Sequence, residues 1–198
     1  MHNLIIAAHP RVKSFNHAVV QAYTAALAER GHQVACRDLY AIGFNPILSA
    51  RDMAAISRSK PPIDIRRELH AIAAADAITV IAPLWWGGFP AVLKGYIDRV
   101  FTAGSPYLAK NTAYGRSLFG RKGAIITTSE ASVDELRSDG TLRALKRHHK
   151  GLMEYCGVEV VGQLYLGGVA PTMSRTTSEG HLKTVQRFVR RAFWPATG

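Results

Sequence analysis

The sequence is short of cysteine and lacks the features that mark secreted or zinc-binding proteins. Its two cysteines, Cys36 and Cys156, cannot build a disulfide framework, and no Cys/His cluster suggests a bound metal. The segment Met1–Asn3 lacks the basic start of a signal peptide, and no small-residue cleavage site follows it. These absences predict a cytoplasmic protein without a metal centre, in which Cys156 is a small buried hydrophobe.

Motifs of several enzyme classes are absent as well. The sequence contains no GxSxG nucleophile elbow, no HExxH metal motif, no GxGxxG fingerprint and no Walker P-loop. His148 and His149 are adjacent, so on a helix they point in different directions and make a poor metal pair. The common hydrolase, metalloprotease, NTPase and dinucleotide-fold signatures therefore give no support to those functions.

One long uncharged stretch raises the question of a membrane span. Residues 77–93 carry no charge over 17 positions, which is close to the length of a membrane-spanning helix. Pro83, Gly87, Gly88 and Pro90 would interrupt such a helix, so a strand, a loop and a new helix are expected instead. The sequence thus predicts no membrane insertion, and its length suits a single domain over residues 1–198.

Acidic residues are scarce relative to basic ones. The 14 Asp and Glu face 25 Lys and Arg, which gives a formal net charge of +11. The basic residues gather at residues 137–150 and 175–191, both in expected helices. Solvated helix faces, a nucleic-acid surface and a general attraction for anionic ligands would each explain them. No recognised nucleic-acid module accompanies the charge, so nucleic-acid binding is not the prediction.

Apolar runs alternate with amphipathic segments along the whole chain. Strands are expected at residues 4–8, 33–37, 77–82, 123–128 and 158–166. Helices are expected at residues 14–30, 63–75, 90–101, 133–155 and 178–193, with a short one within 49–62; Gly140 and Gly151 are expected to interrupt 133–155. This alternation predicts an α/β protein with a doubly wound, five-stranded parallel sheet of order 2-1-3-4-5, which is the flavodoxin-like arrangement. Ligands of such sheets bind beyond the carboxyl ends of the strands, so the loops after strands one, three and four are the places to search.

The first of these loops leads directly into a helix. The N–H groups at a helix start lack acceptors, and the helix dipole adds positive potential, so the turn can hold an anion. Ser14 and Asn16 would add hydrogen bonds, and Arg11 and Lys13 would add charge. Taken alone, the segment favours a simple helix cap by Ser14 or Asn16, because polar residues start most helices, and anion binding stays the alternative.

The other two loops offer aromatic faces and polar donors. Trp85 and Trp86 precede two glycines that permit close backbone approach, so a planar ring could stack there. Packing in the core or against a second copy is the alternative. Residues 127–130 could donate hydrogen bonds to the carbonyl oxygens of a heterocycle, although Ser/Thr runs often merely end strands. The apolar helix stripe within 93–101 could contribute to a dimer contact or simply pack on the sheet.

Four segments together resemble a known family. They are residues 8–18 (AHPRVKSFNHA), 38–52 (DLYAIGFNPILSARD), 82–107 (APLWWGGFPAVLKGYIDRVFTAGSPY) and 120–129 (GRKGAIITTS). They are similar to the NAD(P)H:quinone oxidoreductase family of flavodoxin-like fold. That family includes DT-diaphorase, bacterial quinone reductases and ancillary subunits of potassium-efflux systems, and the resemblance covers most of the chain.

The resemblance implies a cofactor site made of three groups of residues. The positions that match those holding the flavin's phosphate-bearing tail are His9, Ser14, Phe15 and Asn16. Those that match the loop along the isoalloxazine edge are Leu84, Trp85, Trp86 and Gly87. Those that match the loop at the pyrimidine end are Thr127, Thr128, Ser129 and Glu130. Trp86 and Tyr107 match residues of the nicotinamide and quinone pocket, where the tyrosine usually comes from the second subunit of a dimer.

The implied function is that of a homodimeric flavoprotein. It would carry electrons from NADPH or NADH to a quinone or similar small acceptor by ping-pong hydride transfer. FAD is favoured as the cofactor, with FMN close behind. The alternative is a flavin-binding regulatory subunit that acts by contact with a transporter or another partner protein.

The sequence departs from the family pattern in three places. Ser129 and Glu130 stand where the family commonly has two glycines, and a carboxylate there could repel charge near reduced flavin. Residues 131–141 contain neither the Tyr nor the His that well-studied quinone reductases use during hydride transfer, so the catalytic residues stay unassigned. Gly87 replaces a bulky aromatic residue, which should enlarge the pocket.

Overall fold

The computed structural model describes residues 1–101 and 118–194. Five parallel strands form one sheet: β1 (His2–Ala7), β2 (Gln33–Asp38), β3 (Ala77–Pro83), β4 (Arg121–Thr128) and β5 (Val158–Leu166). Their order is β2-β1-β3-β4-β5, and every neighbouring pair is parallel. The predicted doubly wound, flavodoxin-like sheet is therefore confirmed.

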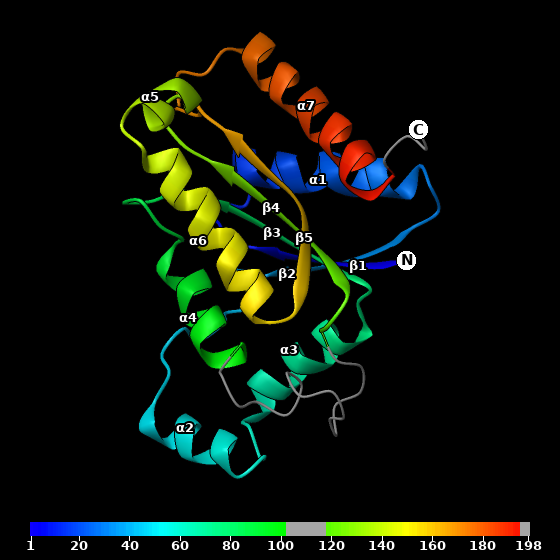
Figure 1. Ribbon diagram of the computed structural model, residues 1–198, viewed down its shortest axis with the longest axis vertical. Coiled ribbons are helices and arrows are strands. Elements are labelled where there is room, and N and C mark those ends of the chain that lie inside the picture. Colours follow the sequence, from blue (N-terminus) through cyan, green and yellow to red (C-terminus); the bar gives the residue numbers. More distant parts are fainter. Residues whose placement is uncertain (102–117, 195–198) are drawn as a thin grey trace.

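Helices cover both faces of this sheet (Figure 1). They are α1 (Phe15–Ala28), α2 (Ala50–Ser57), α3 (Ile63–Ala74), α4 (Ala91–Val100), α5 (Val133–Ser138), α6 (Thr141–Tyr155) and α7 (Arg175–Phe193). One buried cluster joins α1 and α7 to the sheet, and another joins α3, α4 and α6 to its opposite face. Within the described residues, no helix combines the length and apolarity needed to cross a membrane.

The alternation of side chains along the strands explains the two clusters. Successive residues of a strand point to opposite faces, and both faces here are covered. Accordingly Ile5 and Ile81 pack with α1 and α7, whereas Leu4 and Val80 pack with α3 and α4. All seven residues of β3 are buried, which accounts for the long uncharged stretch without any membrane.

Of the two glycines predicted to interrupt the basic segment, only one does. Gly140 separates α5 from α6, because its φ of 82° lies in the left-handed region. Gly151 does not interrupt it: α6 continues through this residue, which is exposed and has open space around its Cα. Helix α7 begins at Arg175 rather than Ser178, because the Ser174 hydroxyl caps it by accepting the N–H of Thr177.

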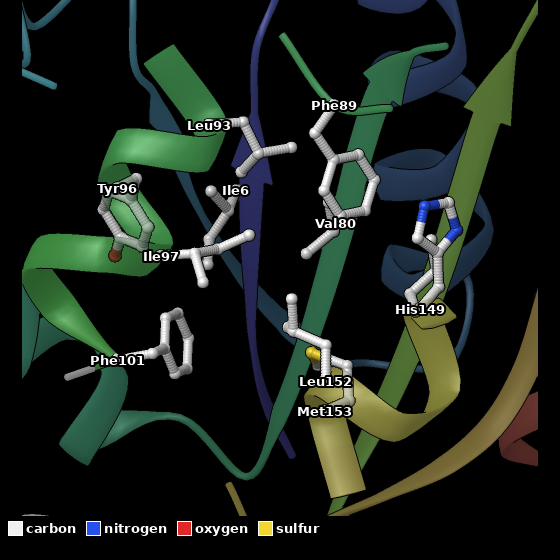
Figure 2. A pocket seen from close by; sticks show the side chains of 11 residues that line it. Ile6, Val80, Phe89, Leu93, Tyr96, Ile97, Phe101, His149, Leu152 and Met153 are labelled. Atoms are coloured by element: carbon white, nitrogen blue, oxygen red, sulfur yellow. The ribbon is translucent and has the colours of Figure 1, made fainter. Parts of the chain in front are cut away.

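The apolar stripe of α4 packs on the sheet. Leu93, Tyr96, Val100 and Phe101 are all buried within the chain, so sheet packing accounts for the stripe. An apolar cavity of about 10 Å³ remains between α4 and α6. Figure 2 shows side chains of α4 on one side of this cavity and side chains of α6 on the other. It has room for about one water molecule at most.

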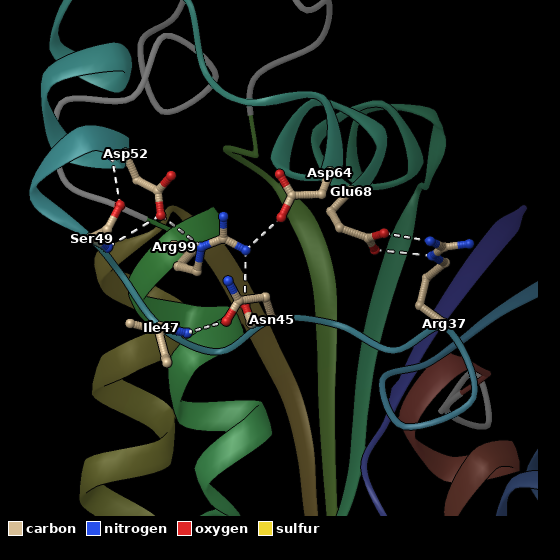
Figure 3. Close-up of polar contacts among 8 residues, drawn as sticks. All are labelled: Arg37, Asn45, Ile47, Ser49, Asp52, Asp64, Glu68 and Arg99. Atoms are coloured by element: carbon tan, nitrogen blue, oxygen red, sulfur yellow. Dashed lines mark hydrogen bonds and ion pairs between the residues drawn. The ribbon is translucent and has the colours of Figure 1, made fainter.

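Buried charges tie the outer helices together (Figure 3). The Arg99 guanidinium on α4 is 3% exposed and donates to Asp52 of α2 at 3.2 Å and to Asp64 of α3 at 2.6 Å. It also donates to the backbone carbonyl of Asn45 at 2.8 Å. One cation thus joins three helices and the connector that precedes α2.

Candidate functional site

A large cavity lies at the carboxyl edge of the sheet. Its volume is about 980 Å³, and it is lined by the loops after β1, β3, β4 and β5. Of the residues that the sequence assigns to the flavin, all line it except Gly87 and Thr127. Tyr107 lies outside the described residues. The loops at the strand ends therefore line one continuous cavity.

One end of the cavity is the start of α1. Ser14 caps the helix, and its Oγ accepts the N–H of His17 at 3.4 Å. Among the described residues, the N–H groups of Phe15 and Asn16 have no acceptor. Arg11 and Lys13 also line this end. Capping and anion binding are thus compatible here, because the cap leaves two N–H groups free for a ligand.

His17 contacts Ser14, and a second histidine, His9, lines the same cavity. The Ser14 Oγ and His17 Nδ1 are 2.8 Å apart, and His17 Nε2 lies 2.8 Å from a carboxylate oxygen of Asp38. His9 Nδ1 accepts the N–H of Arg11 at 3.1 Å. Burial lowers the pKa of His9, and the charge of Arg11 acts in the same direction. A neutral His9 carries its hydrogen on Nε2 and can donate it to a ligand.

Asn16 joins this end of the cavity to β4. Its side-chain amide donates to the Thr128 hydroxyl at 3.0 Å, and both residues are buried. The contact spans α1 and the end of a central strand, so it fixes the floor of the cavity. Thr127, the next residue along β4, points to the opposite face of the sheet, which explains why it does not line the cavity.

The tryptophan loop is a tight turn. Trp85 and Gly88 exchange two backbone hydrogen bonds of 2.9 Å each, and positive φ angles at Trp86 (52°) and Gly87 (71°) match a type I′ turn. The Trp86 side chain is fully exposed at 104%, and the Trp85 side chain is 41% exposed. Core packing therefore does not explain Trp86. Gly87 supplies the second positive φ of the turn and does not line the cavity.

The third loop uses its polar groups within the chain. Ser129 donates its N–H to the Leu166 carbonyl at 2.9 Å and its hydroxyl to the Ala131 carbonyl at 2.8 Å. Both donors of Ser129 are thus used within the chain, and its contact with a heterocycle stays a prediction. Glu130 is exposed on the cavity wall, and its N–H has no acceptor among the described residues.

Comparison with known proteins decides the family. A family model described as having a flavodoxin-like fold matches residues 1–189. The chain belongs to this family. An NAD(P)H oxidoreductase of Haemophilus influenzae is 39% identical over 163 residues, which cover 81% of this chain and 81% of that protein. NAD(P)H dehydrogenase (quinone) 1 of Cavia porcellus is 31% identical over 191 residues, which cover 85% of this chain and 69% of the relative.

Solved structures agree with this family assignment. The NAD(P)H:quinone oxidoreductase from Methanothermobacter marburgensis matches this flavodoxin-like chain with a TM-score of 0.83 and 32% identity, covering 96% of each. An FMN-dependent NADH-azoreductase from Bacillus anthracis has a TM-score of 0.72 at 18% identity, covering 96% of this chain and 98% of that one. The second likeness shows the shared fold alone. The resemblance predicted from the four sequence segments is confirmed.

Sequence reasoning missed one wall of this flavodoxin-like site. The segment after β5 contributes Val169, Ala170, Pro171, Met173, Arg175 and Ser178 to the cavity. The carboxyl-edge rule that selected the other loops applies equally to the fifth strand. That rule, applied to every strand end, would have found this wall.

A buried His–Tyr pair also escaped prediction. The His149 ring of α6 stacks on Phe89 at 4.3 Å between ring centroids, and its Nδ1 lies 3.0 Å from the Tyr165 hydroxyl. Burial lowers the pKa of His149 to about 4, with His148 adding to the effect. The neutral ring therefore supports the segment that follows the tryptophan turn. His148 is exposed and points elsewhere, and the described residues contain no cluster able to hold a metal.

Proposed function

We propose that this oxidoreductase binds a flavin in the carboxyl-edge cavity and passes electrons from NADPH or NADH to a quinone or a similar small acceptor. The observation that carries the proposal is the pairing of two features in one cavity. Free N–H groups at the start of α1 form one end, and the exposed indoles of Trp85 and Trp86 form another. A phosphate and a planar ring on one ligand fit this pairing.

The donors present fit the cofactor's chemistry. The N–H groups of Phe15 and Asn16, with Arg11 and Lys13 beside them, suit a phosphate. The Glu130 N–H and the Nε2–H of a neutral His9 are further donors on the cavity wall. When bound, a flavin supplies an acceptor for hydride and a donor for the second substrate. The protein's own part is to orient the ring and hold the phosphate.

FAD is the favoured flavin. The cavity continues past the start of α1 along the segment after β5, where Arg175 adds another positive charge. A second phosphate and an adenosine group would have room there. FMN would fill only the part between α1 and the tryptophan turn, and it stays the close alternative.

We propose that the nicotinamide and then the acceptor occupy the open side of the cavity in turn. Trp86 stands fully exposed beside that opening, where its indole can stack on either substrate. Tyr107 is proposed to join the same pocket from a second copy of the chain. We accordingly propose a homodimer with ping-pong kinetics, in which neither substrate needs the other to be bound. The cytoplasmic location expected from the sequence stays part of the proposal.

A visible spectrum of the purified protein tests this function. We expect a yellow protein after incubation with FAD, and bleaching when NADPH or NADH is added without oxygen. Mass analysis of the released cofactor separates FAD from FMN. A protein that stays colourless with both flavins contradicts flavin binding, and a yellow protein that neither nicotinamide bleaches contradicts the reductase function alone.

The basic face of α6 favours a second candidate function. Arg143, Lys146 and Arg147 are exposed, and none has an ion-pair partner within residues 1–101 and 118–194. They line a groove of about 530 Å³ beside the edge strand β5. A regulatory subunit that contacts an acidic partner protein would use such a surface. A flavin-loaded protein that does not turn over NADPH with menadione would favour this second function.

A further inference from the structure

The Ser14 hydroxyl has one hydrogen, and its direction depends on the protonation of His17, whose Nδ1 lies 2.8 Å from the Ser14 Oγ. One carboxyl oxygen of Asp38 accepts the N–H groups of Tyr40 and Ala41 at 3.1 and 3.2 Å. Its other oxygen lies 2.8 Å from His17 Nε2, and a carboxylate oxygen can only accept, so a carboxylate at Asp38 places a hydrogen on this nitrogen. In a neutral His17 ring, Nδ1 then has only a lone pair.

A lone pair on His17 Nδ1 determines the direction of the Ser14 hydrogen bond. The Ser14 Oγ lies 2.8 Å from this nitrogen, so its hydroxyl must donate to the ring. Only oxygen lone pairs then remain on Ser14, one of which accepts the His17 N–H. In this state Ser14 cannot donate to a phosphate oxygen in the cavity that it lines. With a neutral His17, the proposed anion site at the start of α1 therefore lacks the Ser14 hydroxyl as a donor.

A proton on His17 reverses the hydrogen bond. Nδ1–H would donate to the Ser14 oxygen, and the hydroxyl hydrogen would become free to donate to an anion. The same proton adds positive charge beside the helix start. A phosphate bound at the helix start would favour this protonated form, because it places negative charge beside the ring.

We propose that His17 is the proton-linked positioning residue of the phosphate end, so that binding of a flavin phosphate takes up a proton at His17 and turns the Ser14 hydroxyl toward the ligand. This inference rests on the proposed function, since it takes a flavin as the anion. It adds that affinity for the phosphate-bearing tail falls as pH rises, because uptake of a proton on binding becomes less favourable.

The groups around His17 are few. On its own helix Ser14 contacts it, and from the end of β2 Asp38 accepts its hydrogen. From the loop after β1, the His9 ring faces it with the centroids 6.4 Å apart. Arg11 and Lys13 line the same end of the cavity. His9 is therefore the neighbour that could take up a proton in place of His17, and it serves as the matched control.

Titration calorimetry of the apoprotein with FAD tests the inference. FAD is the better probe, because its diphosphate does not titrate near neutral pH, whereas the phosphate of FMN does. Measured at pH 7.5 in buffers of different ionisation enthalpy, we expect uptake of up to about one proton per FAD bound. The Kd should rise with pH over the range in which uptake is measured. Riboflavin, which lacks the phosphate, should bind without proton uptake.

Two variants test which histidine takes up the proton. His17→Gln can still hydrogen-bond but cannot take up a proton, so we expect the uptake to vanish. His9→Gln can weaken FAD binding, because His9 is a proposed donor to the cofactor, but the FAD that binds should still take up the proton. Nitrogen NMR of the wild-type imidazoles gives the same answer without a variant, since His17 Nδ1 should gain a hydrogen when FAD binds. Proton uptake that persists in His17→Gln, or FAD binding without any uptake, overturns this inference alone. Failure of the wild type to bind flavin at any pH overturns the proposed function as well.

Discussion

The molecule contains two polar regions that treat their charges differently. Around Arg99, each buried charge meets an opposite charge or a carbonyl supplied by the chain itself, and the guanidinium is closed off from solvent (Figure 3). In the carboxyl-edge cavity, the N–H groups of Phe15 and Asn16 have no acceptor among the described residues. Closed networks of this kind hold the fold, whereas open donors at a cavity are left for a ligand.

The largest effect is expected from opening the closed network. Arg99→Met removes the cation that both Asp52 and Asp64 face, and leaves their carboxylates without it. Loss of one partner of a buried ion pair typically costs about 3–5 kcal/mol of unfolding free energy. Urea denaturation of wild type and variant measures this cost.

The matched control for Arg99 is an exposed ion pair on the same helix. Lys94 and Asp98 form an i,i+4 pair on the surface of α4, so Lys94→Met should cost only about 0.3–0.5 kcal/mol. If Arg99→Met cost no more unfolding free energy than Lys94→Met, the Arg99 network would not stabilise the fold.

A smaller and pH-dependent effect is expected at Asp52. Burial alone would raise the pKa of its carboxyl, but hydrogen bonds from Ser49 and the charge of Arg99 outweigh burial and lower it. A lowered folded pKa means that the carboxylate stabilises the fold above its unfolded pKa of about 3.9. This stabilisation disappears as pH falls through the lower, folded value.

The Asp52→Asn variant tests this dependence of stability on pH. At pH 7 the variant should lose about 1–3 kcal/mol, the usual cost of weakening hydrogen bonds to a charged group. The gap between wild type and variant should stay constant down to about pH 5 and shrink below about pH 4. Urea melts at a series of pH values measure the gap, and a gap that widened as pH fell would contradict the assignment.

The smallest effect on stability is expected in the open region. Trp86 holds a φ of 52° that bulky residues rarely adopt, and its side chain contributes no burial. Trp86→Gly should therefore leave stability unchanged or raise it by about 1 kcal/mol. Loss of the indole should weaken ring stacking by about 0.5–1.5 kcal/mol. Flavin and nicotinamide titrations test the second part, and a marked loss of stability would show that Trp86 serves the fold.

The sequence was sufficient where structure depends on local pattern. Apolar runs located the strands and turn residues located the loops, because periodicity and glycine punctuation are properties of neighbouring residues. The strand order followed from the topology that alternating strands and helices usually adopt. The same reasoning placed Ser14, Asn16 and Trp86 at one cavity.

It was insufficient where contacts join distant segments. Asp38 reaches His17 across 21 positions, and His149 meets Tyr165 only once α6 has packed on β5. The donors of Ser129 bond the carbonyls of Leu166 and Ala131, and nothing in a Ser/Thr run reveals such partners. The pairing of side chains depends on tertiary geometry that local patterns do not encode.

The tryptophan turn has a consequence for how the protein can change over time. Its shape is set by backbone hydrogen bonds between Trp85 and Gly88 and by the positive φ of Gly87. The side chain at position 86 takes no part in the core. Selection can therefore exchange that side chain without repacking its surroundings, in favour of residues that tolerate a positive φ. If Trp86 contacts the acceptor as proposed, substitutions at position 86 could change the range of acceptors at little risk to folding.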